Sequence, residues 1–209
     1  MRKRIAVLVS GGGTNLQALI DAQSRGGIVG GEIAAVIASK PGVFALERAA
    51  KAGIPSYVVA RSNYPDSRAM TIALRDKLKE LEIDLVVLAG FMTILTGELV
   101  QAYPNAILNV HPALIPSFCG EGYYGLHVHE QALAYGVKIS GATVHFVSEE
   151  CDGGPIILQK AVEVLPDDTP EKLQRRVMEQ CEWILLPQAV SLFCQDRLRV
   201  EGRTVRILP

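Results

Sequence analysis

Residues 5–20 read I-A-V-L-V-S-G-G-G-T-N-L-Q-A-L-I, and this stretch predicts the fold class of the chain. Ile5–Ser10 is almost entirely apolar, which is typical of a strand buried on both faces of a parallel sheet. Three glycines follow, and Leu16, Leu19 and Ile20 then recur at helical spacing. The stretch therefore predicts a strand, a glycine loop and a helix, which together form the repeating unit of an α/β fold.

The same alternation continues along the chain. We expect strands at 33–38, 55–59, 84–89 and 106–110, and helices at 44–52, 67–81, 97–103 and 128–135. Two later runs, 141–147 and 156–164, predict an antiparallel extension of the sheet, Thr169 can cap a long helix, and 198–206 has hairpin character. We therefore expect a single domain over residues 1–209, with a mostly parallel twisted sheet and helices on both faces.

Composition excludes several classes of protein. The 209 residues are 49% hydrophobic and 21% charged with a formal net charge of -1, which is typical of a globular domain and not of a disordered chain. The charge is balanced, so the composition shows no excess of basic residues that would favour binding to nucleic acid or an anionic membrane. No stretch approaches the ~18 apolar residues of a membrane span. We therefore expect small-molecule partners, no nucleic acid and no membrane.

The cysteines favour a reducing compartment. Cys119, Cys151, Cys181 and Cys194 are far apart in sequence and form no C-x-x-C pair, although one disulfide pair remains formally open. Only five apolar residues, Ile5–Val9, precede the glycines, which is short for a signal peptide. We expect a cytoplasmic protein.

The glycine loop is a candidate phosphate site. Its sequence, S-G-G-G-T-N at 10–15, precedes a predicted helix N-terminus, where free N–H groups attract an anion. Leu16 occupies the place of the third glycine in the dinucleotide fingerprint, and no P-loop lysine follows. The loop therefore favours a single phosphate over a pyrophosphate. The alternative is a tight turn that needs glycine for its geometry alone.

A second candidate site lies at the end of the strand 106–110. Asn109 and His111 point to the same side by alternation, and an amide beside an imidazole can stabilise an oxyanion and move a proton. The alternative is that His111 only satisfies core carbonyls. Asp152, in E-E-C-D-G-G-P at 149–155, can orient His111 and raise its pKa, or can be an ordinary turn residue.

Two other kinds of site find little support in the sequence. No G-x-S-x-G motif indicates a serine hydrolase. His127-x-His129 has no further ligand at a suitable spacing, so we predict no metal site.

Taken together, these segments resemble a known family. S-G-G-G-T-N-L-Q-A-L (10–19), D-L-V-V-L-A-G-F-M-T-I-L (84–95), N-V-H-P-A-L-I-P-S-F (109–118), H-E-Q-A-L (129–133), G-A-T-V-H-F-V (141–147) and D-G-G-P-I-I-L-Q (152–159) resemble the phosphoribosylglycinamide formyltransferases of purine synthesis, in order and over essentially the whole chain. The resemblance implies the Rossmann-like formyltransferase fold, with a phosphate-binding half (about 1–100) and a catalytic, folate-binding half (about 101–209). The enzyme is expected to be a monomer or a homodimer.

The resemblance also implies a reaction and residue roles. The formyl group of 10-formyltetrahydrofolate, the co-substrate, passes to the amine of glycinamide ribonucleotide, and no metal is involved. The catalytic residues implied are Asn109, His111 and Asp152, with His111 as the proton donor held protonated by Asp152. Gly13, Thr14, Asn15 and Glu182 are implied for the ribonucleotide, and Arg68, Met92, Thr93, Ile94, Leu95, Asn109, Ser148, Glu149, Glu150, Cys151 and Asp152 for folate.

The chain departs from the family pattern at three places. Thr93 stands where an arginine is common, Trp183 follows Glu182 where a histidine is often found, and 119–124 lengthens the loop after His111. A transfer-RNA formyltransferase is expected to carry a basic C-terminal domain, and a formyltetrahydrofolate hydrolase an N-terminal regulatory domain. The sequence shows neither. A non-catalytic nucleotide-binding module would need the glycine loop, but not the three catalytic residues together.

Overall fold

One mixed sheet runs through the protein, whose computed structural model describes residues 2–209; the first residue of the predicted domain lies outside the described part. The strand order within these residues is β3-β2-β1-β4-β5-β6-β7-β9-β8. Five strands are parallel, namely β1 (Lys3–Val9), β2 (Gly31–Ala38), β3 (Ser56–Val58), β4 (Leu85–Leu88) and β5 (Ile107–His111). β6 (Ile139–Phe146) and β7 (Ile156–Glu163) continue the sheet in antiparallel fashion, and the hairpin of β8 (Leu198–Glu201) and β9 (Thr204–Ile207) ends it. The predicted sheet and its antiparallel extension are confirmed.

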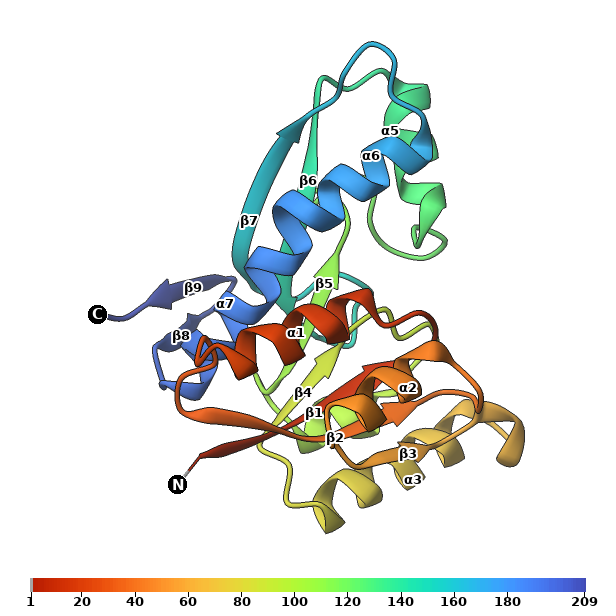
Figure 1. The fold of residues 1–209 in the computed structure, drawn as a ribbon, viewed down its shortest axis with the longest axis vertical. Coiled ribbons are helices and arrows are strands. Elements are labelled where there is room, and N and C mark those ends of the chain that lie inside the picture. Colours follow the sequence, from red (N-terminus) through yellow and green to blue (C-terminus); the bar gives the residue numbers. More distant parts are fainter. Residues whose placement is uncertain (1) are drawn as a thin grey trace.

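Helices cover both faces of this sheet (Figure 1). They are α1 (Thr14–Ser24), α2 (Phe44–Lys51), α3 (Ser67–Glu80), α4 (Gly97–Ala102), α5 (Leu126–Tyr135), α6 (Pro170–Val177) and α7 (Trp183–Cys194), with a short 3-10 turn η1 (Arg61–Asn63). One buried cluster takes side chains from α1, α2 and α5 to α7, and a second takes them from α3 and α4. The predicted elements are present, with ends that differ by one or two residues.

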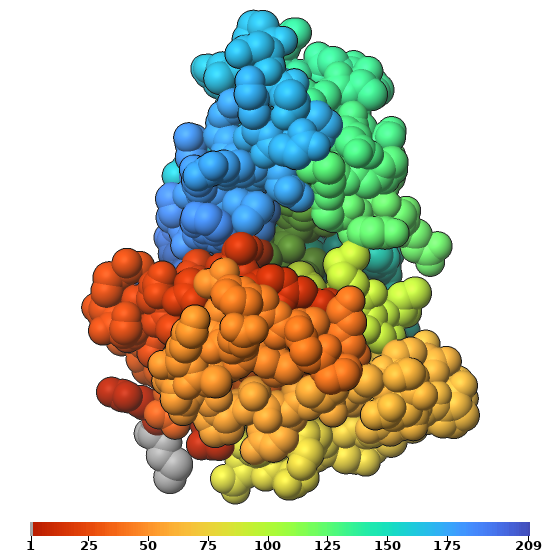
Figure 2. Space-filling model, turned by 45° about the vertical axis from the view of Figure 1, so that its right-hand side comes forward, coloured from red at the N-terminus to blue at the C-terminus, as the bar shows by residue number. Residues whose placement is uncertain are grey.

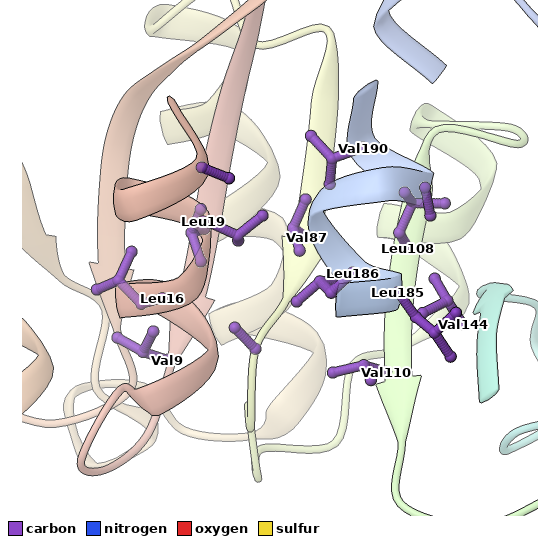
Figure 3. Close-up of a cluster of buried hydrophobic side chains, with 14 of the residues drawn as sticks. Val9, Leu16, Leu19, Val87, Leu108, Val110, Val144, Leu185, Leu186 and Val190 are labelled. Atoms are coloured by element: carbon purple, nitrogen blue, oxygen red, sulfur yellow. The ribbon is translucent and has the colours of Figure 1, made fainter. Parts of the chain in front are cut away.

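Strand β1 explains why the opening run of sequence is apolar throughout. Ile5, Val7 and Val9 belong to the first buried cluster, whereas Ala6 and Leu8 belong to the second. In the first cluster, side chains of α1 and α7 meet those of the central strands, as Figure 3 shows for Leu16, Leu19, Leu185, Leu186 and Val190 against Val87, Leu108 and Val144. A strand covered on both faces needs apolar side chains at every position.

The last helical region differs from the prediction. In place of one long helix after Thr169, a five-residue π-helical segment, η2 (Met178–Glu182), separates α6 from α7. The Thr169 cap is confirmed, because its side chain accepts a hydrogen bond from Lys172 N. The π-segment ends at Glu182, and such segments often occur at functional sites.

The molecule has two regions with a hollow between them. Figure 2 shows the N-terminal residues, red to yellow, below the green and blue C-terminal residues, with the surface recessed where they meet. The carboxyl ends of the parallel strands lie on one edge of the sheet, where ligands bind in open α/β folds. No helix among residues 2–209 is long and apolar enough to cross a membrane, and all four cysteines are free.

Candidate active site

The strand pairing between β5 and β6 assembles the centre of the site. β5 ends with Asn109 and His111, and the antiparallel register places His145 of β6 opposite Asn109. His145 Nδ1 lies 2.8 Å from the Phe146 carbonyl and donates to it, so Nε2 of neutral His145 can accept from Asn109 Nδ2, 3.2 Å away. His145 has no predicted role from sequence, because only the strand register places it beside Asn109.

Asp152 completes this cluster from the loop between β6 and β7. Its Oδ2 lies 3.4 Å from His111 Nδ1, and its Oδ1 lies 3.4 Å from Asn109 Nδ2 and 3.6 Å from His145 Nε2. The glycines after Asp152 hold the loop against β6, because a Cβ at Gly154 would lie 1.8 Å from the Phe146 carbonyl oxygen. The three predicted catalytic residues are therefore brought together.

Hydrogen bonds fix the proton positions around His111. Its ring N–H at Nε2 donates to the Phe118 carbonyl at 2.8 Å, so in neutral His111 the other ring nitrogen, Nδ1, is an acceptor. Nδ1 faces Asp152 Oδ2, which is also an acceptor, and no proton lies between them. Protonation of His111 would place a donor at this position and complete the hydrogen bond to Asp152.

Burial has the largest effect on the pKa of His111 and lowers it below the ordinary histidine value. The charge of Asp152 and the hydrogen bond to Phe118 raise that pKa, but they do not overcome burial. The effect of Asp152 on the pKa of His111 therefore has the predicted sign, but burial outweighs it and the net pKa is lowered. Burial also raises the pKa of Asp152, but its contacts with His145, the charge of His111 and the hydrogen bond from Gly120 N–H outweigh it, and the net pKa is lowered.

The lengthened loop after His111 contacts both members of this pair. Phe118 accepts from His111, and the Gly120 N–H donates to Asp152 Oδ2 at 2.9 Å. The Phe118 ring packs edge-on against Tyr135 of α5, with ring centroids 6.0 Å apart. The position of this loop cannot be predicted from sequence, because it depends on contacts with residues distant in the chain.

The glycine loop lies between β1 and α1, as predicted. Gly13 has φ +72°, and its Cβ would lie 2.7 Å from Ala45 Cβ, so both backbone conformation and packing require glycine there. Asn15 Nδ2 donates to Glu182 Oε2 at 2.6 Å, which brings two of the predicted ribonucleotide residues together. Burial raises the pKa of Glu182 to about 7, and the Asn15 hydrogen bond partly opposes this.

The turn at 92–95 adjoins the glycine loop, because Met92 N donates to Ser10 Oγ at 2.8 Å. Met92 and Ile94 are exposed apolar side chains of this turn. Gln101 Nε2 donates to Glu149 Oε1 at 3.1 Å and so connects α4 to the 148–152 loop.

Arg68 lies at the outer margin of this region. It pairs with Glu98 of α4, and its side chain is 72% exposed. The 148–152 loop has its own internal hydrogen bond, from Ser148 Oγ to the Glu150 carbonyl at 3.1 Å, and Cys151 is exposed. Thr93 and Leu95 are half-buried in the 92–95 turn. The segments that carry the predicted folate residues are therefore linked in part: Arg68 pairs with Glu98 of α4, and α4 in turn contacts the 148–152 loop through Gln101.

His127 and His129 do not converge on a common ligand position. His127 is exposed and pairs with Glu130, whereas His129 is fully buried and neither of its ring nitrogens has a hydrogen-bond partner. Within residues 2–209 no group of three or more histidine, cysteine or acidic side chains could hold a metal ion.

Comparison with known proteins identifies the family. The model of the formyl transferase family matches residues 3–190, which is most of the chain. The chain belongs to the formyltransferase family. As a formyltransferase it is 43% identical over 199 residues to phosphoribosylglycinamide formyltransferase of Haemophilus influenzae, covering 95% of this chain and 91% of that protein.

Two further proteins to which this formyltransferase is similar support the family assignment. It is 45% identical over 200 residues to the trifunctional purine biosynthetic protein adenosine-3 of Drosophila pseudoobscura pseudoobscura, covering 95% of this chain and 14% of that protein. The crystal structure of glycinamide ribonucleotide transformylase 1 from Symbiobacterium toebii superposes with a TM-score of 0.94 at 46% identity, covering 100% of this chain and 95% of that one. The predicted formyltransferase fold is confirmed.

Proposed function

We propose that this formyltransferase transfers the formyl group of 10-formyltetrahydrofolate to the amine of glycinamide ribonucleotide in purine biosynthesis. The observation that carries the proposal is the polar cluster of Asn109, His111, His145 and Asp152 at the carboxyl edge of the sheet, next to the glycine loop. The relatives named for this activity support the choice of both substrates.

The cluster can serve the chemistry of formyl transfer. When the substrate amine attacks the formyl carbon, the carbonyl oxygen gains negative charge, and Asn109 Nδ2 can donate a hydrogen bond to it. A protonated His111 can donate its Nε2–H to the same oxygen when substrate binding releases that N–H from the Phe118 carbonyl, while Nδ1–H stays with Asp152. The bond from the formyl carbon to the folate nitrogen then breaks. That nitrogen gains a proton as the amine loses one, and His111 is the proposed proton donor. Asp152 stabilises the imidazolium and can position a water.

The two substrates are assigned to adjoining segments. Gly13, Thr14 and Asn15, at the N-terminus of α1, are proposed to bind the phosphate, and Glu182 the ribose. For folate we propose Arg68, the turn Met92–Leu95, Asn109 and the loop Ser148–Asp152. The exposed apolar side chains of the turn would contact the ring system, and backbone groups can replace the charged contact that Thr93 does not supply.

A product assay tests the proposal. The purified protein is mixed with 10-formyltetrahydrofolate, and tetrahydrofolate release is followed by absorbance with and without glycinamide ribonucleotide. We expect release only with the ribonucleotide and in equal amount to the formylated product. Release without an acceptor amine would indicate a hydrolase, and no release would favour a non-catalytic nucleotide-binding module.

The proposal includes the setting of the reaction. We expect a cytoplasmic enzyme, in keeping with four free cysteines, that works as a monomer or a homodimer and needs no metal. Light scattering measures the oligomeric state, and unchanged activity after treatment with a chelator tests the metal requirement.

A further inference from the structure

Helix α2 donates hydrogen bonds to carbonyl groups of the glycine loop and so holds the loop in place. Ala45 N donates to the Gly11 carbonyl at 3.1 Å, and Arg48 Nε donates to the Gly12 carbonyl at 2.8 Å. The third carbonyl, that of Gly13, accepts from Gln17 N of α1 at 2.9 Å. All three carbonyl oxygens of the loop therefore have a donor.

These contacts also fix the directions of the loop N–H groups. In a planar trans peptide the N–H points opposite to the carbonyl of the same unit. The N–H groups of Gly12, Gly13 and Thr14 therefore point away from the donors that hold the three carbonyls. Cβ atoms built at Gly11 and Gly12 would meet nothing within 4 Å, so the loop has open space for an approaching group.

The Arg48 side chain both holds the conformation of this loop and places a positive charge beside it. Its Nη1 donates to Gln17 Oε1 at 2.9 Å, and its guanidinium lies 4.8 Å from the centroid of the Phe44 ring. Arg48 also lines a hollow of ≈ 320 Å³ together with Thr14 and Trp183. No carboxylate within residues 2–209 forms a direct ion pair with Arg48; Asp21, which lines the same hollow, is linked to it only through Gln17, whose Nε2 donates to Asp21 Oδ1 at 2.8 Å.

We propose that Arg48 is a positioning residue for the substrate phosphate, an inference that rests on the proposed function. It holds the Gly12 peptide so that the Gly13 N–H faces the phosphate, and it adds an unpaired positive charge at the N-terminus of α1. The role requires both the charge and the fixed geometry of the guanidinium, because a lysine ammonium on its flexible stem lacks the rigid fork that contacts the Gly12 carbonyl and Gln17 together.

Lys51 provides a matched control on the same helix. Its Nζ lies 5.8 Å from the Phe44 ring centroid, but it makes no contact with the glycine loop among the described residues. Lys51→Met and Arg48→Met remove the same charge from α2, and only the second removes the hydrogen bond to Gly12. A difference between the two variants therefore reports on what Arg48 does at the loop, through its hydrogen bond and its local charge, and not on the net charge of the helix.

The experiment combines steady-state kinetics with phosphate binding. For Arg48→Met we expect the KM for glycinamide ribonucleotide to rise by about tenfold or more, with kcat and the folate KM changed by less than about twofold. Inorganic phosphate, titrated while the backbone amide signals of Gly12, Gly13 and Thr14 are followed by NMR, should bind Arg48→Met correspondingly more weakly. Arg48→Lys should recover only part of the affinity, and Lys51→Met should behave as the wild type.

The outcomes separate this inference from the proposed function. Wild-type phosphate affinity in Arg48→Met, or an equal loss in Lys51→Met, overturns the role of Arg48 whatever the enzyme acts on. Absence of ribonucleotide-dependent activity in the wild type overturns the proposed function, while the phosphate titration still tests Arg48. Thermal unfolding of each variant confirms that the comparison is made between folded proteins.

Discussion

At the scale of single residues, the site depends on four side-chain contacts of 3.2 to 3.6 Å, which join Asp152 to Asn109 and to two histidines, and Asn109 to His145. The His111–Asp152 contact lacks a proton when His111 is neutral, and protonation of His111 would supply one. The carboxylate therefore affects the protonation of His111 more than its position, since the Phe118 carbonyl already holds the ring.

Replacing Asp152 by Asn should lower the pKa of His111 further. Burial already lowers this pKa, and the substitution removes the negative charge that opposes the effect. Less imidazolium would be present near neutral pH, so activity should fall and its pH profile should move toward acid. NMR titration of isotope-labelled His111 in both proteins measures the shift, and equal midpoints would show that Asp152 acts by other means.

Asn109→Ala should reduce turnover much more than substrate binding. Removal of one oxyanion donor costs roughly 10²–10³ in kcat in acyl-transfer enzymes, and formyl transfer places similar charge on the carbonyl oxygen. Initial rates over a range of both substrates give kcat and the two KM values. A kcat close to that of the wild type would mean that Asn109 serves mainly to hold His145 and Asp152.

At the scale of elements, the loop between β1 and α1 is held in its conformation by close packing against α2. Gly13 meets Ala45 at a distance that allows no side chain, while Gly12 faces open space. The two glycines therefore have different reasons to be glycine. Gly13 is required by packing and by its positive φ, whereas Gly12 leaves room for a ligand.

Gly13→Ala should destabilise the fold, and Gly12→Ala should not. The alanine at 13 would adopt a left-handed backbone, at a cost of roughly 1–2 kcal/mol, and would also push against α2. Urea denaturation compares the free energy of unfolding of the two variants with that of the wild type. Equal stability of all three would contradict the close packing of α2 against the loop.

At the scale of the whole molecule, two buried titratable groups, His129 and Glu182, have opposite effects on the free energy of unfolding as the pH changes. Burial, with a smaller contribution from the charge of His111, lowers the pKa of His129 to about 4. Its contribution to stability is therefore present above the unfolded value of about 6.5 and is lost as the pH falls toward about 4. Glu182, with a pKa raised to about 7, stabilises the fold below about 4.5 and loses this effect as the pH rises toward 7.

His129→Leu should therefore reduce the loss of unfolding free energy as the pH falls from 7 to 4. In the wild type, protonation of His129 should cost on the order of 3 kcal/mol of unfolding free energy between pH 7 and pH 4. Glu182→Gln should make the loss on acidification steeper, because it removes the opposing effect. Urea denaturation at several pH values measures both slopes, and identical slopes in wild type and His129→Leu would refute the buried, neutral state of His129.

The sequence alone indicated nearly all of the elements, the glycine loop and the Asn109–His111 pair, while the remaining proposed site residues came from the resemblance to a known family. Continuous apolar runs such as 5–9 and 84–89 are visible locally, because a strand buried on both faces leaves no position for a polar side chain. Local rules also identified the glycine loop and the Asn109–His111 alternation. These features depend on neighbours in the chain, so no tertiary structure is needed to find them.

Tertiary structure alone decided how those residues act on each other. The β5–β6 register brings His145 to Asn109, α2 brings Arg48 to the glycine loop, and the loop after His111 returns to hold that histidine. Each contact joins segments that are far apart in sequence, and sequence separation does not predict their distance in space. The net direction of the His111 pKa belongs to the same class, because burial is a property of the packed molecule and outweighs the charge of the predicted partner, Asp152.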